Sequence, residues 1–369
     1  MRSVTFLIKP ASSLCDLRCR YCFYDDISDL RDVKSMGIMT QATAEMLIQR
    51  AVESVMPGGL IHFMFQGGEP TLAGLDFFRS FLKLEEKYVT HGIQVIHAIQ
   101  TNGMRVDEEW AAFFKKHDFL VGISIDGNKH IHDSLRLDAA GIGTWDRVTA
   151  ALKILEEVGV ETNLLCVVTA SVAKNPQKVY GSLKSLGSHP LQFIPCLDPM
   201  EAPRGQENYS LTPQKYGKFL CGLFDCWYRD WKQGNYVSIR TFDDYLRILA
   251  GMPPSGCANA GTCGSYLVVE GDGSMYPCDF FVLDEWKIGN LADMTVKEAL
   301  TSEVSRKFLE ESRQRPAACV KCAYRPICRG GCRRDWTRER KNYYCESFRQ
   351  FFAYALPRLV EMAGALSSR

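Results

Sequence analysis

Eleven of the fifteen cysteines stand in two spaced sets. Near the N-terminus, Cys15, Cys19 and Cys22 form a C-x3-C-x2-C motif. Eight more crowd into a C-terminal stretch: Cys257, Cys263, Cys278, Cys319, Cys322, Cys328, Cys332 and Cys345. A [4Fe–4S] cluster has four irons, so three thiolates leave one iron open for chemistry, whereas four thiolates close the cluster for electron storage or structure. Three plus eight therefore predicts one open cluster and two closed ones, which favours an enzyme.

Zinc is the main alternative for cysteines at fixed spacings. The last histidine is His189, so no imidazole is available among the eight C-terminal cysteines for a mixed Cys/His site. Two all-cysteine zinc sites stay open, because ligand count alone does not separate zinc from iron–sulfur. The odd cysteine total argues against a fully paired disulfide framework.

Length and charge narrow the class of protein. At 369 residues, the chain exceeds the size at which one core stops growing, so two domains are expected. A formal charge of +1 predicts no nucleic-acid or membrane-surface partner. The N-terminus carries no signal-peptide pattern, and no apolar run is long enough to span a membrane. We therefore expect a cytoplasmic protein, in which spaced cysteines bind metal.

Strand-like runs alternate with helical patterns as far as about residue 235. The expected strands are Val4–Lys9, Ile61–Gln66, Gln94–Gln100, Leu120–Ile125, Glu161–Val168 and Leu191–Pro195. The expected helices are Gln41–Val55, Asp76–Tyr88, Glu108–His117, Trp145–Val158 and Pro176–Leu186. This alternation predicts an α/β fold with a parallel sheet, and six units favour a partial (β/α)6 barrel over a closed eight-stranded one. Short polar motifs follow the strands, where such folds place their ligands.

The chain changes character beyond a helix expected from Pro213 to Trp231. Two short β-runs around Gly271-Asp272-Gly273 predict a hairpin, and helices are expected at Thr295–Leu300 and Glu303–Ser312. The stretch from Pro316 to Cys345 has little apolar periodicity, so it plausibly folds around its metal. We expect three segments: an α/β domain at 1–235, a cysteine-rich domain at 236–345, and a C-terminal helix within 346–369.

The N-terminal motif, followed by Phe23, strongly resembles that of the radical S-adenosylmethionine superfamily. Gly67-Gly68-Glu69-Pro70 is similar to the superfamily's GGEP element, in which glycine backbone lies beside the cofactor. The resemblance implies that Cys15, Cys19 and Cys22 hold a [4Fe–4S] cluster whose open iron chelates S-adenosylmethionine. It also implies cofactor contacts from five residues: Tyr21, Gly68, Ser124, Arg136 and Leu197. Taken singly, each of these is as well explained by a structural role.

The C-terminal cysteines resemble a SPASM domain, found in peptide-modifying radical enzymes. The resemblance implies two auxiliary [4Fe–4S] clusters, with interleaved ligands. One would be held by Cys257, Cys263, Cys278 and Cys332. The other would be held by Cys319, Cys322, Cys328 and Cys345.

From its first strand to Cys345, the chain resembles the anaerobic sulfatase-maturating enzymes. That resemblance implies oxidation of a Cys or Ser in an unfolded or nascent sulfatase to Cα-formylglycine, with a flavodoxin or ferredoxin as electron donor. A 5′-deoxyadenosyl radical would take a hydrogen atom from the target Cβ, and Asp279 would remove the side-chain proton. The auxiliary clusters would accept an electron or serve structure alone. Tyr24 and Gln66 are candidates for the substrate pocket, and burial would make Asp279 a stronger base.

Two other functions stay open. The first is another SPASM maturase that forms thioether or carbon–carbon crosslinks, and the second is a non-catalytic metal-stabilised or electron-transfer protein. The four remaining cysteines are expected to be small buried apolar residues: Cys166, Cys196, Cys221 and Cys226.

Overall fold

The computed structural model describes residues 1–90, 92–187, 189–264 and 266–367. They form two compact units, each assembled from separate parts of the chain. Unit 1 comprises Met1–Ser124, Arg136–Thr162 and Ser265–Phe308, and unit 2 comprises Ile125–Leu135, Asn163–Gly264 and Leu309–Arg369. The division into 1–235, 236–345 and 346–369 stays a prediction, and residues 368 and 369 of its last segment lie outside the described residues.

Unit 1 contains a mixed sheet with strand order β4-β3-β2-β1-β7-β8-β9. Its strands are β1 (Ser3–Ile8), β2 (Leu60–Phe65), β3 (Gln94–Thr101), β4 (Leu120–Ser124), β7 (Leu267–Val269), β8 (Ser274–Tyr276) and β9 (Gly289–Asn290). Neighbours from β4 to β7 pair in parallel, whereas β7-β8 and β8-β9 are antiparallel. The parallel strands place their C-terminal ends at one edge, so the loops that follow them share that edge.

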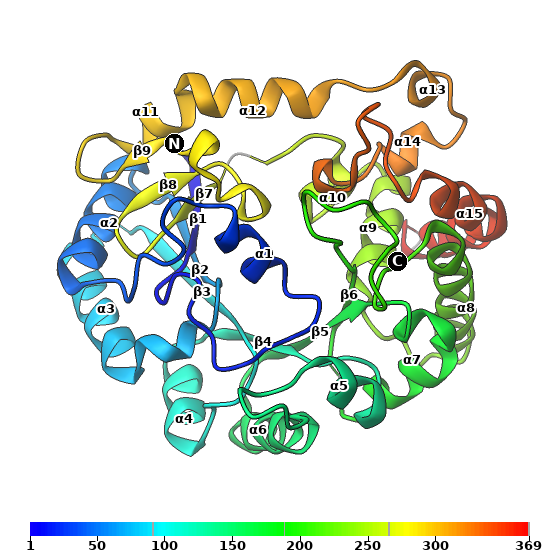
Figure 1. The fold of residues 1–369 in the computed structure, drawn as a ribbon, viewed down its shortest axis with the longest axis horizontal. Coiled ribbons are helices and arrows are strands. Elements are labelled where there is room, and N and C mark those ends of the chain that lie inside the picture. The colour runs from blue at the N-terminus through cyan, green and yellow to red at the C-terminus, as the bar shows by residue number, and fades with distance from the viewer. Residues whose placement is uncertain (91, 188, 265, 368–369) are drawn as a thin grey trace. The chain divides into compact units, whose positions relative to one another are not determined.

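Helices cover one face of this sheet, as Figure 1 shows for α2, α3 and α4 around the strands. The helices of unit 1 are α1 (Phe23–Asp29), α2 (Gln41–Ser54), α3 (Leu75–Tyr88), α4 (Glu108–Lys116), α6 (Trp145–Val158) and α11 (Val296–Thr301), with 3₁₀ turns at Pro70–Ala73, Asp279–Phe281 and Asp284–Trp286. Side-chain oxygens begin several of them; Thr40, for example, accepts a hydrogen bond from the Thr43 amide at the start of α2. The covered face is rich in aromatic rings. Phe65 packs against Phe78 and Phe81 at centroid distances of 5.0 and 5.2 Å.

Unit 2 combines one parallel strand pair with a helical layer. β5 (Thr162–Val168) pairs with β6 (Leu191–Pro195). Its helices are α5 (Lys129–Leu135), α7 (Pro176–Lys184), α8 (Pro213–Lys232), α9 (Arg240–Leu249), α10 (Cys257–Ala260), α13 (Ala317–Val320), α14 (Arg325–Cys328) and α15 (Cys345–Ser367), with 3₁₀ turns at Val172–Lys174 and Arg333–Asp335. One further helix, α12 (Glu303–Arg313), crosses the boundary between the two units along the chain.

The core of this helical layer is aromatic. Phe351 of α15 packs against Phe224 of α8 and Phe242 of α9 at centroid distances of 5.7 and 5.5 Å. Phe219, Phe224 and Trp227 are fully buried and form core, whereas Tyr228 and Trp231 of the same helix are half-buried.

All six expected strands of the α/β region and the hairpin are present, with ends that differ by one or two residues. The five helices expected between the strands are also present. Six helices were not expected: α1, α5, α9 and the four-residue α10, α13 and α14. The first two have only seven residues and follow polar loops, so their sequences show less than two full turns of apolar periodicity. Among the described residues, no helix is long and apolar enough to cross a membrane.

A buried ion triad joins the ends of β1 and β7 in unit 1. The Glu270 carboxylate contacts the Lys9 ammonium at 2.8 Å and the Arg31 guanidinium at 2.6 Å, and all three side chains are almost fully inaccessible. Burial alone would raise the pKa of Glu270, but the two cations outweigh it and hold that pKa below its usual value. The triad therefore depends on the one negative charge between two positive ones.

Replacing this carboxylate should destabilise the protein strongly. Glu270→Gln leaves two buried cations without a counter-ion, at a cost of about 3–5 kcal/mol. The matched control is Glu53→Gln, because Glu53 pairs with Arg50 at the surface, where such a pair contributes about 0–1 kcal/mol. Thermal unfolding should show a much larger fall in Tm for Glu270→Gln.

The pH dependence of this difference follows from the lowered pKa. The stabilisation from Glu270 is present above its unfolded pKa of 4.5 and is lost as the pH falls through the lower folded value. Equal melting temperatures for the two variants at neutral pH would contradict the role of the triad.

Candidate functional site

The N-terminal cysteines lie on the loop between β1 and α1 in unit 1. Cys15, Cys19 and Cys22 are each half-buried, and Cys22 is the residue that precedes α1. The Leu17 amide lies 3.4 Å from the Cys15 sulfur, and the Asn102 side-chain amide lies 3.8 Å from it. The loop thus holds its thiols at the edge where the parallel strands end.

The electrostatics of these thiols favour a metal-bound state. Desolvation raises the pKa of Cys15 to about 12, with further contributions from Glu69, Cys19 and Asp16, and it also raises the pKa of Cys22. A bound iron cluster reverses this preference, because its positive charge stabilises the thiolates directly. The half-buried loop therefore suits metal ligands better than free nucleophiles.

Gly68 and Glu69 hold the cysteine loop in place. The Gly68 amide donates to the Ser12 carbonyl at 2.9 Å, and the Glu69 amide donates to the Leu14 carbonyl at 2.7 Å. A Cβ on Gly68 would lie only 2.0 Å from the Leu14 carbonyl oxygen. Glycine is therefore required here by the close approach of the loop's own backbone.

The Glu69 carboxylate then ties this loop to the end of β3. It is buried and accepts hydrogen bonds from the Thr101 hydroxyl at 2.7 Å, the Asn102 amide at 2.8 Å, and the Thr71 amide and hydroxyl at 3.0 and 2.6 Å. The Asn102 side chain continues the connection to Asp16 at 2.7 Å. Two polar motifs that are distant in sequence thus converge on the cysteine loop.

Four of the five expected cofactor contacts belong to unit 1. Arg136 and Tyr21 are both buried, with the guanidinium 5.5 Å from the ring centroid, and the Arg136 charge acts on the Cys22 thiol. Ser124 ends β4 and accepts a hydrogen bond from Gln100 at 3.0 Å. Gly68 lies beside the cysteine loop, whereas Leu197 belongs to unit 2. Their contacts with S-adenosylmethionine stay predictions.

Asp279 has a buried carboxylate, and only one of its two oxygens accepts hydrogen bonds from the described residues. Oδ2 accepts a hydrogen bond from the Tyr24 hydroxyl at 2.5 Å and a longer one from the Gln66 amide at 3.4 Å. The Gln66 amide also donates to the Tyr24 oxygen at 2.7 Å. Oδ1 is buried and has no hydrogen-bond partner among the described residues. Such an atom can accept a hydrogen bond from a proton donor of the substrate.

The pKa of this carboxyl is shifted in the direction that strengthens a base. Burial raises the pKa of Asp279 to about 6, with the Lys9 charge and the Tyr24 hydrogen bond opposing the rise and Glu270 adding to it. Asp279 is thus largely ionised at neutral pH yet more basic than an exposed aspartate. The desolvation expected from the sequence is present.

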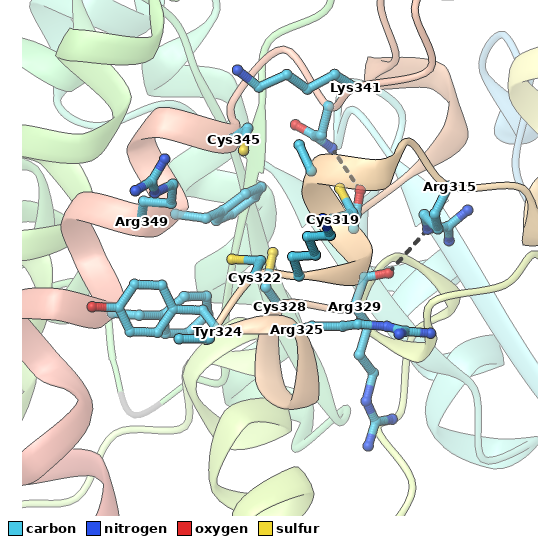
Figure 2. A pocket seen from close by; sticks show the side chains of 17 residues that line it. Arg315, Cys319, Cys322, Tyr324, Arg325, Cys328, Arg329, Lys341, Cys345 and Arg349 are labelled. Carbon is cyan, nitrogen blue, oxygen red and sulfur yellow. Dashed lines mark hydrogen bonds between the residues drawn. The ribbon is translucent and has the colours of Figure 1, made fainter.

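Four C-terminal cysteines line one cavity of about 320 Å³ in unit 2. They are Cys319, Cys322, Cys328 and Cys345. Figure 2 shows them on separate segments, from α13 to the start of α15. Desolvation raises the pKa of Cys328 to about 11, and the other three thiols raise it further, which confirms that the four lie close together. This grouping matches the ligand set implied for one auxiliary cluster.

Three ligands of the other implied cluster line a second, smaller pocket. Cys257, Cys263 and Cys332 lie there with Arg315 and Trp336. Cys278, the fourth, belongs to unit 1, where its sulfur accepts from the Tyr266 hydroxyl at 3.5 Å. In residues 1–90, 92–187, 189–264 and 266–367, no three His, Cys, Asp or Glu side chains are placed as ligands of a single metal ion.

The other cysteines are mostly core residues, as expected. Cys166, Cys196 and Cys226 are buried. Cys221 is only half-buried, so that expectation was wrong for this residue. It lies one residue after the buried Leu220 on α8, on a part of the helix that is not fully covered.

Comparisons with known proteins assign both cysteine regions. A family model described as the radical SAM superfamily matches residues 10–172, and one described as an iron–sulfur cluster-binding domain (SPASM) matches residues 257–323. The chain is 45% identical to the cysteine-type anaerobic sulfatase-maturating enzyme of Clostridium novyi (strain NT) over 374 residues, covering 100% of both chains. The chain belongs to the anaerobic sulfatase-maturating enzymes. It is a radical SAM enzyme with a SPASM domain, which excludes the non-catalytic alternative.

Other relatives agree with this family and with the fold. The serine-type anaerobic sulfatase-maturating enzyme of Klebsiella aerogenes is 32% identical over 349 residues, covering 94% of this chain and 84% of the relative. A solved structure described as native anSMEcpe with bound AdoMet and Cp18Cys peptide is 44% identical, with a TM-score of 0.93 and coverage of 99% of each chain. The predicted α/β core with a cysteine-rich second domain is confirmed. S-adenosylmethionine and iron–sulfur clusters are the cofactors of this enzyme family.

Several residues near Asp279 or in the cysteine pockets could not be singled out from the sequence. Arg31 and Glu270 are 239 residues apart along the chain, and neither stands in a motif that predicts their contact. Lys9 carried no signal beyond its place at the end of the first expected strand. Arg315, which lines both cysteine pockets, carried no signal beyond its place in an Arg-rich segment.

A side chain at position 68 should prevent assembly of the N-terminal cluster. Gly68→Ala places a methyl group against the Leu14 carbonyl, which must displace the cysteine loop. Total iron after anaerobic reconstitution should fall by about one third, because one of three clusters is lost. The matched control is Gly181→Ala in α7, where an added Cβ meets no atom within 4 Å. Equal iron content in the two variants would show that the loop tolerates the side chain.

Proposed function

We propose that this enzyme oxidises a cysteine in an unfolded segment of a sulfatase to Cα-formylglycine. The observation that carries the proposal is the buried Asp279 carboxylate, whose Oδ1 is free to accept a proton while Tyr24 and Gln66 hold Oδ2. It is supported by full-length similarity to relatives named as sulfatase-maturating enzymes.

The residues that hold the cofactors follow from the cysteine sets. Cys15, Cys19 and Cys22 would hold the first cluster. The residues that would bind S-adenosylmethionine are Tyr21, Gly68, Ser124, Arg136 and Leu197. When both are bound, they supply a 5′-deoxyadenosyl radical that takes a hydrogen atom from the target Cβ. The buried lining around Tyr21 and Arg136 keeps water from that reactive species.

Asp279 supplies the base for the side-chain proton. Its Oδ1 accepts the S–H proton of the target cysteine, while the hydrogen bond from Tyr24 to Oδ2 fixes the orientation of the carboxylate. Lys9 stabilises the ionised form before the proton arrives. Loss of the Cβ hydrogen atom, the proton and one electron converts the cysteine to a thioaldehyde, whose hydrolysis gives the aldehyde and hydrogen sulfide. An auxiliary cluster held by the C-terminal cysteines would accept that electron.

The comparisons favour cysteine over serine as the target. Relatives named as cysteine-type are 45% identical to this chain, whereas those named as serine-type are 31–32% identical. The described structure with 0.93 TM-score contains a peptide named Cp18Cys. We therefore assign the cysteine-type reaction and rank the crosslinking maturase below it.

An electron donor and a cellular compartment complete the proposed function. The first cluster needs one electron for each cofactor cleavage, which a flavodoxin or a ferredoxin can deliver. We propose the cytoplasm as the site of action, because its reducing conditions keep the cluster cysteines available for iron.

Removing the base should separate cofactor cleavage from product formation. Asp279→Asn keeps the hydrogen bond from Tyr24 through its amide oxygen but cannot accept the proton, so formylglycine formation should fall about 100-fold or more. Cleavage of S-adenosylmethionine should continue in part. Mass spectrometry of a sulfatase-motif peptide measures formylglycine formation, and chromatography of 5′-deoxyadenosine measures cofactor cleavage.

The matched control for this variant is Asp284→Asn, an exposed aspartate on the same segment, which should retain both activities. Normal peptide oxidation by Asp279→Asn would refute the assignment of the base. A crosslinked peptide without hydrogen sulfide from the wild-type enzyme would instead favour the crosslinking maturase.

Loss of one N-terminal thiol should abolish cofactor cleavage altogether. Cys15→Ala leaves two thiolates, too few to hold the cluster that binds S-adenosylmethionine. Production of 5′-deoxyadenosine should drop to background, whereas Cys166→Ala, which removes a buried core thiol, should retain it. Unchanged production by Cys15→Ala would place the radical chemistry elsewhere.

A further inference from the structure

The near-zero charge of the whole chain conceals a strongly basic segment. The segment from Arg313 to Arg349 contains eleven Lys and Arg residues against three Asp and Glu residues, while the full chain has 44 against 43. The four cysteines of the larger pocket, Cys319, Cys322, Cys328 and Cys345, lie within this segment. Positive charge is thus concentrated around the site implied for one auxiliary cluster.

All the charged side chains that line the cavity are positive. Six basic residues line it and no Asp or Glu does: Arg315, Lys321, Arg325, Arg329, Lys341 and Arg349. Figure 2 shows the cysteine side chains near the centre of the view, with labelled Arg and Lys side chains around them. Such an arrangement creates a focused positive potential at the pocket.

Two of these cations are engaged within the protein. Arg315 donates to the backbone carbonyls of Gly261, Ser312, Gln314 and Arg329. Arg329 donates to the Pro326 carbonyl at 3.1 Å. Both are half-buried, so they are placed to balance the negative charge of the thiolates inside the pocket.

The other four, which we name the basic rim, are Lys321, Arg325, Lys341 and Arg349. All four are exposed, and their side chains form no ion pair or hydrogen bond with any described residue. Elsewhere on the surface, comparable cations pair with carboxylates, as Lys87 does with Glu45 and Arg358 does with Asp225. The basic rim is therefore free to pair with carboxylates of another molecule.

An exposed apolar residue is adjacent in sequence to the basic rim. Val320 lies between Cys319 and Lys321 and is 53% exposed. Protein–protein interfaces combine exposed apolar residues with a polar, charged rim, and transient redox complexes have the smallest interfaces. The patch has the chemistry expected of such an encounter.

We propose that the basic rim is the docking surface for a small acidic protein that carries one electron, of the flavodoxin or ferredoxin class. The inference rests on the proposed function, because it takes the four cysteines as ligands of an auxiliary cluster. In each encounter the auxiliary cluster, reduced by the electron from the substrate, passes that electron to the oxidised carrier. The cluster is oxidised, the carrier is reduced, and no bond is formed or broken. Opposite charges accelerate the association and make it sensitive to salt.

Binding of oxidised flavodoxin to the reconstituted holoenzyme tests this surface without any turnover. The dissociation constant is measured by calorimetry at low and at high ionic strength for the wild type, for Arg325→Glu/Arg349→Glu and for Lys83→Glu/Lys116→Glu. The last pair changes the net charge equally on exposed positions of α3 and α4. The rim variant should bind at least about tenfold more weakly at low salt and lose most of its salt dependence, while the control should match the wild type.

Three results would overturn the proposal: equal binding by both double variants, no binding by the wild type, or rim-dependent binding of single-stranded RNA with no binding of flavodoxin. If iron content falls in the rim variant, Arg325→Gln/Arg349→Gln replaces it, with an expected weakening of about threefold and the same overturning result. Peptide oxidation by the wild type with dithionite as reductant tests the proposed function separately, because a small chemical reductant needs no docking surface.

Discussion

The buried carboxylate of Glu69 is the interaction on which the catalytic arrangement depends. Its oxygens accept hydrogen bonds from Thr71, Thr101 and Asn102, and its amide holds the Leu14 carbonyl. Because a buried carboxylate without partners is costly, the folded state selects the one loop conformation that satisfies it. That conformation presents three thiols at the edge where the parallel strands end, which is the arrangement the proposed open cluster requires.

A second constraint is the distribution of charge around Asp279. Glu270 lies between Lys9 and Arg31, so the positive charge that reaches Asp279 from Lys9 is offset in part. Loss of the Lys9 charge would raise the pKa of Asp279, whereas an unopposed Lys9 would lower it and make Asp279 a weaker base. The observed balance keeps Asp279 ionised but basic, which suits removal of a thiol proton. In the proposed mechanism, cysteines bind the redox centres and this one carboxylate accepts the proton.

The sequence predicted the strands and the cysteine grouping well, because both leave periodic or spaced signals. Cys319, Cys322, Cys328 and Cys345 line one cavity, as the resemblance to a SPASM domain implied. It did not predict α1, because seven residues after a cysteine motif carry little periodicity. The sequence also did not predict the contact of Arg31 with Glu270 or the unpaired state of the basic rim. Both depend on which distant side chains meet in the fold. Cys221 was misjudged because cysteine type alone does not fix burial.

The most direct measurement is electron–nuclear double resonance on the reduced enzyme with S-adenosylmethionine labelled with nitrogen-15 at its amino group. If three cysteines leave one iron open, the reduced cluster should show hyperfine coupling to the labelled nitrogen, and Cys19→Ala should abolish it. Absence of that coupling in an enzyme with full iron content, or coupling to a fourth protein ligand in its place, would contradict the account.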